Sequence, residues 1–290
     1  MTLRIEVNNV SVKFKNRYAL KDITFTINEN KIYGLLGRNG AGKTTLLSLL
    51  ASFREPSSGS ISIEGEDPFE NAKLMQHVNF VFNKDYKDET DNLKNTLENV
   101  NRYRPYFDFD YANHLIQRFK LPMDKPLKQF SKGMQSAVSV TIGLASRAPI
   151  TIFDEAYNGM DAPTREIFYQ ELLEDQSEHP RIIIMSTHLV SEMDYLFDEV
   201  LIVNIGELVL QEEYESLVTK GASITGPAED VDSFVQSMNQ LNTKQLGNTK
   251  SVMIYGELSD AERKAAQAKG LEVGPISLQE LFIHLTEGEE

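Results

Sequence analysis

Residues 37–45 of this sequence read Gly37-Arg38-Asn39-Gly40-Ala41-Gly42-Lys43-Thr44-Thr45. They fit the pattern G-x-x-x-x-G-K-[ST], in which the backbone N–H groups of a glycine-rich loop surround phosphate oxygens. An apolar run from Lys31 to Leu36 predicts a strand before the loop, and a helical pattern follows it from Lys43 to Ser52. This order is the context that the pattern requires. The glycine spacing does not match G-x-G-x-x-G, which argues against a dinucleotide loop.

The loop predicts ATP or a related nucleoside triphosphate as ligand, with Mg²⁺ beside it. Lys43 is expected to bridge the β- and γ-phosphates, and the hydroxyl of Thr44 is expected to bind Mg²⁺. The N-terminus of the following helix adds a favourable field for the phosphates. The loop residues expected to contact the nucleotide are Gly37, Asn39, Gly40, Ala41, Gly42, Lys43, Thr44 and Thr45.

Two other predicted strands end in side chains that suit phosphate hydrolysis. The run Ile150–Phe153 is followed by Asp154 and Glu155, and the run Ile182–Met185 leads to His188. Asp154 is expected to hold Mg²⁺ through water, and Glu155 to act as general base on the attacking water. His188, at the carboxyl end of a central strand, is expected to sense the γ-phosphate and to support that water. A purely structural histidine is the alternative.

Composition excludes several classes of protein. The chain has 290 residues, 41% of them hydrophobic, which is typical of a globular protein. The absence of cysteine excludes disulfides and cysteine-ligated metal sites. A net charge of −14 argues against nucleic acid as a partner, because general binding to nucleic acid needs clustered Lys and Arg. No apolar run approaches the roughly 18 residues of a membrane span, and residues 1–10 show no signal-peptide pattern.

Together these residues resemble the ATPase subunit of an ABC transporter, from about residue 3 to residue 212. The segment Phe130-Ser131-Lys132-Gly133-Met134-Gln135 resembles the family signature L-S-G-G-Q, with Lys132 and Met134 as departures. It lies about 20 residues before Asp154, as the family requires. The resemblance implies that Ser131 and Gly133 face the γ-phosphate of ATP bound to the other subunit of a dimer. An N-cap at Ser131 is compatible with that role.

Three further positions follow from the resemblance. The segment 158–161 resembles the loop that crosses the dimer interface and places Asp161 there, although Ala156-Tyr157 stands where the family usually has Pro-Thr. Tyr18 occupies the place of an aromatic ring that stacks on adenine, with a generic exposed tyrosine as the alternative. Asn83 stands where the family has a glutamine, and it implies a nucleotide and Mg²⁺ contact on a shorter side chain.

The expected fold is an α/β P-loop ABC ATPase with an antiparallel β subdomain and a helical subdomain at about 84–135. The ATPase domain is expected at 1–220 and a small C-terminal α/β accessory domain at 221–290. In the accessory domain, the pattern predicts strands at 222–225 and 251–255 and helices at 228–240, 259–268 and 277–286. Other P-loop classes fit less well. A small GTPase needs N-K-x-D, and here Tyr86 stands in place of the Asp. Chromosome-structuring ABC proteins separate the nucleotide motifs by a long coiled coil, and ABC translation factors carry two cassettes.

The resemblance implies separate membrane subunits, bound through the segment at about 84–125, and a homodimer or a heterodimer with a sister ATPase subunit. The subunit would then lie at the cytoplasmic face of the membrane. The alternative for the aromatic side chains of that segment is the core of the helical subdomain. These side chains are Tyr86, Tyr103, Tyr106, Phe107, Phe109 and Tyr111.

The signature and the tail at 277–283 resemble those of Gram-positive exporter ATPases linked to antimicrobial-peptide response or to export of phenol-soluble modulins. ATP-driven closure of the dimer would pull on the membrane subunits, and hydrolysis would reopen it. Two other functions remain open. One is a sensor or resistance subunit that does not move substrate, and the other is a soluble ABC ATPase acting on the ribosome or DNA.

Overall fold

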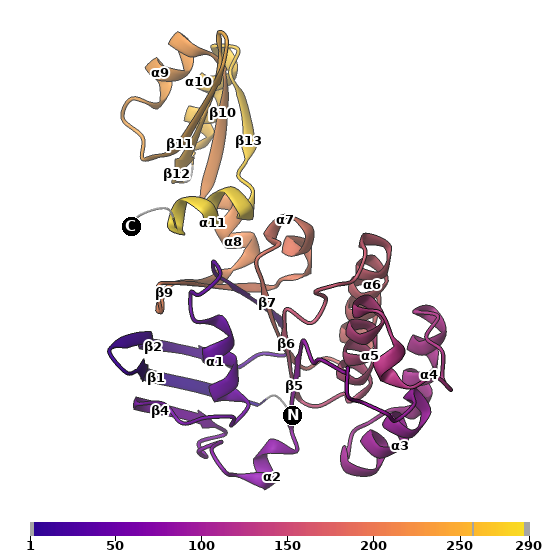
Figure 1. Cartoon of the computed structure of the whole chain (residues 1–290). Coiled ribbons are helices and arrows are strands. Elements are labelled where there is room, and N and C mark those ends of the chain that lie inside the picture. The colour runs from indigo at the N-terminus through magenta and orange to yellow at the C-terminus, as the bar shows by residue number, and fades with distance from the viewer. Residues whose placement is uncertain (1–2, 257, 287–290) are drawn as a thin grey trace.

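The computed structural model describes residues 3–256 and 258–286 (Figure 1). Three β-sheets and the helices that cover them lie within these residues. The larger body holds two of the sheets. In Figure 1 the C-terminal sheet stands apart from this body and meets it near α8 (Tyr214–Thr219) and α11 (Leu278–Thr286).

A six-stranded sheet with the order β5-β6-β7-β3-β8-β9 forms the centre of the larger body. Its strands are β3 (Ile32–Leu36), β5 (Val78–Phe82), β6 (Ile150–Asp154), β7 (Ile182–Thr187), β8 (Glu199–Asn204) and β9 (Glu207–Glu213). The strands run parallel except β9, which is antiparallel to β8. β3, β6 and β7 are buried throughout, as expected of strands covered on both faces. Their carboxyl ends meet at one edge of the sheet.

A three-stranded antiparallel sheet packs beside the central sheet in the order β2-β1-β4. Its strands are β1 (Ile5–Phe14), β2 (Arg17–Ile27) and β4 (Ser58–Ile63). The helix α1 (Lys43–Leu50) shares one apolar core with this sheet and with strands of the central sheet. That core holds the start of α1 against β2. The short helix α2 (Ala72–Met75) precedes β5.

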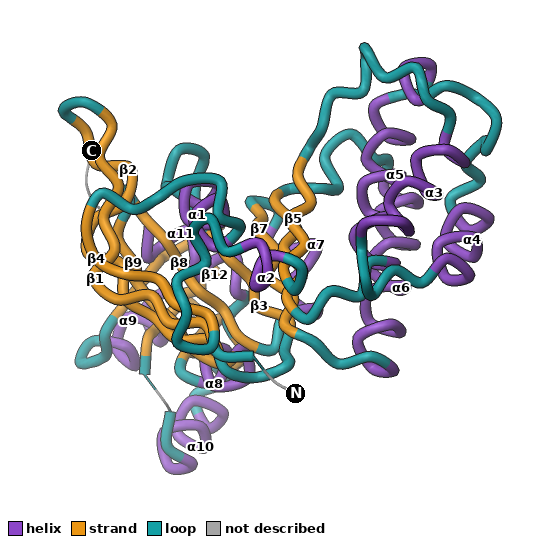
Figure 2. The backbone as a smooth tube through the Cα atoms, turned by 90° about the horizontal axis from the view of Figure 1, so that it is seen from below, coloured by secondary structure: helices purple, strands orange, loops and turns teal. Residues whose placement is uncertain are grey.

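Four helices gather on one side of the central sheet, at the right of Figure 2. They are α3 (Leu93–Tyr103), α4 (Phe109–Arg118), α5 (Lys132–Ala145) and α6 (Ala162–Glu178), with the 3₁₀ turn η1 (Leu127–Gln129) between α4 and α5. Each begins with a side chain that accepts a backbone N–H three residues later, the usual N-cap. These caps are Asn92, Asp108, Ser131 and Asp161.

The aromatic side chains predicted at 84–125 divide between core and surface. Tyr86 is buried, and its hydroxyl lies 3.1 Å from the hydroxyl of Ser139 on α5. Phe107, Phe109 and Tyr111 pack against the same core. Tyr103 and Tyr106 are exposed. For most of these rings the structure therefore supports the core interpretation rather than a docking surface.

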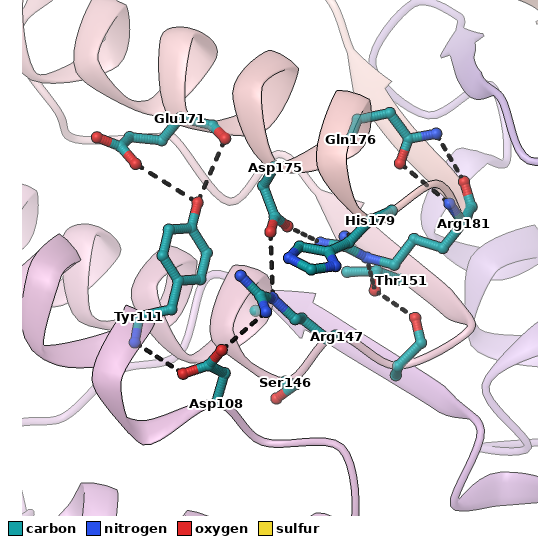
Figure 3. Close-up of polar contacts among 12 residues, drawn as sticks. Asp108, Tyr111, Ser146, Arg147, Thr151, Glu171, Asp175, Gln176, His179 and Arg181 are labelled. Carbon is teal, nitrogen blue, oxygen red and sulfur yellow. Dashed lines mark hydrogen bonds and ion pairs between the residues drawn. The ribbon is translucent and has the colours of Figure 1, made fainter.

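Buried ion pairs join α4, α5 and α6 (Figure 3). The carboxylate of Asp175 on α6 is 1% exposed and lies 3.2 Å from Nε of Arg147 and 2.7 Å from Nη2 of Arg181. Nη1 of Arg147 also lies 2.7 Å from Oδ2 of Asp108, the N-cap of α4. Arg147 therefore joins α4 to α6 immediately after α5 ends.

Asp175→Asn should destabilise the protein by about 3–5 kcal/mol, because it removes the buried carboxylate that pairs with the buried guanidinium group of Arg181 and with the partly exposed one of Arg147. Urea unfolding followed by circular dichroism measures this change. Asp110→Asn on exposed α4 surface is the matched control, and it should change the free energy of unfolding by less than about 1 kcal/mol. Equal effects of the two substitutions would contradict a stabilising role for the network.

The C-terminal sheet has the order β11-β12-β10-β13, with antiparallel neighbours. Its elements are β10 (Gly221–Pro227), α9 (Ala228–Val235), β11 (Gln240–Leu246), β12 (Thr249–Tyr255), α10 (Asp260–Ala268) and β13 (Glu272–Pro275). This sequence of elements and strand order is the split β-α-β arrangement. Side chains of α9 and α10 pack on β10 and β12.

Sequence patterning identified β10, β12 and α10 but missed two strands of this sheet. A helix was predicted over 228–240, whereas α9 ends at Val235 and β11 starts at Gln240. β11 and the four-residue β13 were not predicted. β11 is almost entirely exposed and polar, so pairing with β12 rather than an alternating pattern makes it a strand.

The last helix, α11, packs on the larger body. Leu278, Leu281 and Phe282 belong to the same apolar core as Val190 and Met193. These two residues are the first and last of the short helix α7 (Val190–Met193). α7 starts two residues after His188 and is followed by the 3₁₀ turn η2 (Asp194–Leu196). The helix α11 therefore packs against the segment that follows β7.

Candidate functional site

The glycine-rich loop connects β3 to α1 at the carboxyl edge of the central sheet. Gly42 is the N-cap of α1 and has φ of 109°, a conformation that side chains other than glycine rarely adopt. A Cβ atom there would also lie 2.6 Å from the carbonyl oxygen of Ala19 on β2. Any other residue would displace the loop from β2. The predicted strand, loop and helix are all present.

Lys43 is held inside this loop. Its side chain is 6% exposed, and Nζ donates to the carbonyl oxygen of Gly37 at 2.7 Å. Nζ also lies 3.6 Å from Oε1 of Glu155. A buried ammonium group among backbone carbonyls and one carboxylate can bind further anions, such as phosphate oxygens.

Asp154 ends β6 at the same edge, and Glu155 follows it. Asp154 is buried, and Oδ1 accepts a hydrogen bond from the hydroxyl of Ser186 at 2.5 Å. Glu155 has φ of 46°, an uncommon conformation for this residue type, and its N–H donates to the same hydroxyl at 3.1 Å. Ser186 thus fixes both acidic residues from the neighbouring strand. Sequence reasoning gave no role to Ser186, and only its place beside His188 pointed to it.

The carboxylate of Glu155 lies at the centre of the cluster. Oε1 is 3.1 Å from Nδ1 of His188, and Oε2 accepts from Nδ2 of Asn158 at 2.8 Å. Burial acts to raise the pKa of Glu155, but hydrogen bonds from Asn158 and His188 and the charge of Lys43 outweigh it, so its pKa is lowered. Glu155 is therefore a carboxylate at neutral pH and can accept a proton. Asn158 is a second contact that sequence reasoning did not assign.

Asn83 and Thr44 line one cleft with these carboxylates. The cleft has a volume of about 400 Å³ and is lined by Thr44, Ser48, Phe53, Phe80, Phe82, Asn83, Asp154, Glu155 and Asn158. The polar lining residues carry side-chain oxygen atoms and form the polar wall of the cleft, and Phe53, Phe80 and Phe82 form its aromatic wall. The three residues predicted to bind metal, Thr44, Asn83 and Asp154, therefore face a common space.

Ser131, Gly133 and Asp161 organise the starts of α5 and α6. The hydroxyl of Ser131 accepts the N–H of Met134 at 3.3 Å, and Asp161 accepts the N–H of Thr164 at 3.0 Å. A Cβ atom on Gly133 would lie 2.8 Å from the carbonyl oxygen of Gly159, so the start of α5 and the loop at 158–161 are in contact. The cap at Ser131 occupies the N–H of Met134, and the other N–H groups in the first turn of α5 have no partner within the helix, as at any helix N-terminus.

Tyr18 lies on β2 with more than half of its surface exposed, and Nζ of Lys13 lies 5.1 Å from the centre of its ring. The ammonium group lies over one face of the ring, so a flat ligand would have to stack on the other face or displace Lys13. Within the described residues, Tyr18 does not line the cleft that holds Asn83 and Glu155.

Comparison with known proteins identifies the family. The profile of the family described as "ABC transporter" matches residues 20–158. The ABC transporter ATP-binding protein NatA of Bacillus subtilis (strain 168) is 31% identical over 209 residues, which cover 69% of this chain and 83% of NatA. This chain is an ABC transporter ATP-binding protein.

Two further comparisons concern a relative that matches more of this ABC protein and a solved structure with the same fold. The ABC transporter ATP-binding protein YtrB, also of Bacillus subtilis (strain 168), is 28% identical over 286 residues and is matched over 97% of its length, against 96% of this chain. A solved ATP-binding subunit of an ABC transporter superposes with a TM-score of 0.65 at 23% identity, covering 73% of this chain and 91% of that one. The ABC ATPase fold predicted from the sequence is confirmed. The chain is an ATPase that binds and hydrolyses ATP.

The polar wall of the cleft in this ABC ATPase is suited to Mg²⁺. Mg²⁺ prefers oxygen ligands and usually keeps several waters, with one or two protein ligands and phosphates completing its shell. The Thr44 hydroxyl, the buried Asp154 carboxylate and the Asn83 amide supply such oxygens. Over residues 3–256 and 258–286, no group of three or more His, Asp and Glu side chains could hold a metal without phosphate.

The described part of this ABC protein contains no helix that is long and apolar enough to cross a membrane.

Proposed function

We propose that this ABC ATPase powers a membrane exporter by ATP-driven closure of a dimer. The observation that carries the proposal is that Lys43, Glu155 and His188 meet at one edge of the sheet. Oε1 of Glu155 lies 3.6 Å from Nζ of Lys43 and 3.1 Å from Nδ1 of His188. Such a site hydrolyses ATP in a cleft beside an aromatic wall. The resemblance to ABC transporter ATPases implies that separate membrane subunits couple this chemistry to transport.

Within one chain, Lys43 and the N–H groups of residues 37–45 would hold the phosphates, and Thr44, Asp154 and Asn83 would hold Mg²⁺. When bound, Mg²⁺ neutralises charge on the phosphate oxygens. Glu155 accepts a proton from the attacking water, which its ionised state at neutral pH permits. His188, hydrogen-bonded to Glu155, orients that carboxylate and the γ-phosphate. Tyr18 stacks on adenine.

The second half of each site comes from another subunit. Ser131 and Gly133 present the first turn of α5 to the γ-phosphate of ATP held by the partner, and Asp161 lies at the same interface. The free N–H groups of a helix N-terminus support this role, because they attract anions. Two chains thus enclose two ATP molecules, as a homodimer or with a sister subunit, and hydrolysis separates them.

The aromatic wall of the cleft is the surface we assign to the membrane subunit. Phe53 is 63% exposed and Phe82 is 40% exposed, and the rings contact each other edge to face, with 6.1 Å between their centres. Exposed neighbouring aromatic rings are typical anchors of protein interfaces. The site lies beside Asn83, so a helix docked there senses the nucleotide cleft directly. This position keeps the ATPase at the cytoplasmic face of the membrane.

Phe53→Ser combined with Phe82→Ser should lower recovery of the membrane subunit at least ~10-fold, since each ring is expected to contribute about 2 kcal/mol to the interface. The measurement is quantitative mass spectrometry after affinity purification from detergent-solubilised membranes. Tyr195→Ser, a change at another exposed aromatic side chain, is the control. Undiminished recovery in the double variant, with ATP binding intact, would exclude this surface as the dock.

For the substrate, we propose amphipathic or antimicrobial peptides. The support is the resemblance of the signature at 130–135 and of the tail at 277–283 to Gram-positive exporter ATPases of that kind. Cells that lack this chain should accumulate the exported peptide or become more sensitive to added peptides. Unchanged sensitivity to a panel of such peptides, with transport activity for another compound, would redirect the assignment.

We also propose that the chain divides at about residue 220 into an ATPase domain, 1–220, and an accessory domain, 221–290. The support is that β10 starts at Gly221 and that residues 221–275 form their own sheet and apolar core. We place the helical subdomain at about 84–135 within the ATPase domain. Its last helix, α5, continues beyond this range to Ala145. α11 packs on the larger body and joins the two domains.

Affinity purification of the tagged chain from solubilised membranes tests the transporter proposal. A polytopic membrane protein in stoichiometric amount is the expected companion, and the genes beside it would narrow the substrate. Ribosomal proteins or DNA as the companion would favour a soluble ABC ATPase. A membrane partner that binds the chain without any transport would favour a sensor.

A further inference from the structure

Tyr157 lies where the chain departs from the usual sequence of its family, two residues after Glu155. Its side chain is 1% exposed, and its hydroxyl lies 2.6 Å from the hydroxyl of Thr187. Tyr157 follows β6, and Thr187 is the last residue of the neighbouring strand β7. The contact therefore spans from the carboxylate loop to the residue immediately before His188.

Thr187 in turn fixes the backbone after His188. Its hydroxyl accepts the N–H of Leu189 at 2.9 Å, so the same oxygen atom contacts Tyr157 on one side and the chain beyond His188 on the other. Thr187 is completely buried, so a hydroxyl without a hydrogen bond at this position would destabilise the fold. The backbone of His188 is thereby held from both of its neighbours.

His188 needs such support because its own ring is loosely packed. The ring is 37% exposed, and its recorded polar partner within the described residues is Oε1 of Glu155 at 3.1 Å. A half-exposed side chain keeps its position only as well as the backbone that carries it. Small movements at a catalytic group are expensive, since a misplacement of about 1 Å can cost about 10²-fold in rate.

The hydroxyl of Tyr157 stays protonated under the conditions in which the protein works. Burial raises the pKa of Tyr157 to about 12, against smaller opposing effects of hydrogen bonds with Thr187 and with the backbone of His188. The group is thus a neutral hydrogen-bonding partner and takes no part in proton transfer. Its contribution to the site is geometric.

We infer that Tyr157 is a positioning residue for hydrolysis: through Thr187 its buried hydroxyl fixes the turn that carries His188, and so aligns His188 with Glu155. This inference rests on the proposed roles of His188 and Glu155. The contact between Tyr157 and Thr187 links the loop after β6 to the catalytic residues, and this is the role we assign to the tyrosine.

The test compares Tyr157→Phe with Tyr169→Phe in the purified full-length chain. Both substitutions remove one hydroxyl from a buried ring, but the hydroxyl of Tyr169 has no hydrogen-bond partner in the described part of the chain. Tyr157→Phe should lower kcat about tenfold with KM for ATP changed less than about twofold, because Lys43 and the loop at 37–45, which hold the phosphates, are unchanged. Tyr169→Phe should leave both constants unchanged.

Thr187 provides a second route to the same answer. Thr187→Val, which removes the shared hydroxyl, should lower kcat as much as Tyr157→Phe, and the double variant should be no slower than either one. Thr187→Ser keeps the hydroxyl and should restore turnover. Additive losses in the double variant, or a Tyr157→Phe enzyme as fast as wild type, would overturn the inference. If Tyr157→Phe does not fold, as judged by thermal unfolding, the Thr187 series decides alone.

A spectroscopic readout separates this inference from the proposed function. The imidazole NMR signal of His188, assigned by its loss in His188→Gln, should shift in Tyr157→Phe and stay in place in Tyr169→Phe. An unmoved signal would contradict positioning, whatever the rate. Normal turnover of Glu155→Gln would instead remove Glu155 from its proposed catalytic role. The NMR result would still show whether Tyr157 positions His188.

Discussion

Glu155→Gln should still bind ATP but should hydrolyse it at least ~10²-fold more slowly than the wild-type chain, the scale of losing a general base. Glutamine has the length of glutamate and can keep a hydrogen bond to Asn158, but its amide oxygen cannot take up the proton of the attacking water. The left-handed backbone at residue 155 and the contact with Ser186 do not depend on the side-chain charge. The substitution therefore isolates the proton-accepting step.

Phosphate release at saturating ATP measures the rate, and isothermal titration with ATP measures binding. Glu174→Gln makes the same chemical change at an exposed position on α6, and it should leave both quantities unaltered. Turnover of Glu155→Gln within about threefold of wild type would remove Glu155 from the role of base, since loss of a general base costs far more.

Lys43→Ala should weaken ATP binding at least ~10²-fold, because it removes a buried ammonium group from the phosphate site. In the structure this buried group is fixed by the carbonyl of Gly37 and lies near Glu155, whereas the side chain of Arg38, the other cation of the loop, is exposed. Its loss would leave the Glu155 carboxylate without the nearest compensating charge. Repulsion between that carboxylate and the phosphates adds to the effect.

Titration of Lys43→Ala with ATP and Mg²⁺ tests this expectation, and Lys73→Ala on the exposed side of α2 controls for the loss of one positive charge. Thermal unfolding shows whether the variant keeps its fold. Wild-type affinity in a folded Lys43→Ala chain would refute phosphate binding by the loop at 37–45.

The sequence patterns were sufficient for the parts of the site that depend on local structure. Apolar runs that end in Gly37, in Asp154 and in His188 predict parallel strands, and parallel strands carry their functional side chains at one edge. The strand order β6-β7-β3 is set by long-range pairing, and at the carboxyl edge of these strands Glu155 contacts both Lys43 and His188. That adjacency could be expected only from the family resemblance.

Other contacts lay beyond sequence reasoning because they join segments far apart in the chain. Ser186 reaches Asp154 and Glu155 from the next strand, and Tyr157 reaches Thr187 across the same strand pair. The sequence around a serine, threonine or tyrosine does not indicate which distant residue its hydroxyl contacts in the fold. Exposure is similarly set by tertiary packing, which is why Phe53 and Phe82 form the open aromatic surface while Tyr86 is buried.

The mass of Glu155→Gln in solution, with and without ATP and Mg²⁺, tests the central claim that two chains enclose ATP between the loop at 37–45 of one and Ser131 of the other. Static light scattering should report a monomer without nucleotide and a dimer with ATP. The dimer should disappear when Ser131→Arg is added, because a large cationic side chain blocks the first turn of α5. A monomer at saturating ATP, or a dimer that ignores both ATP and Ser131→Arg, would contradict the account.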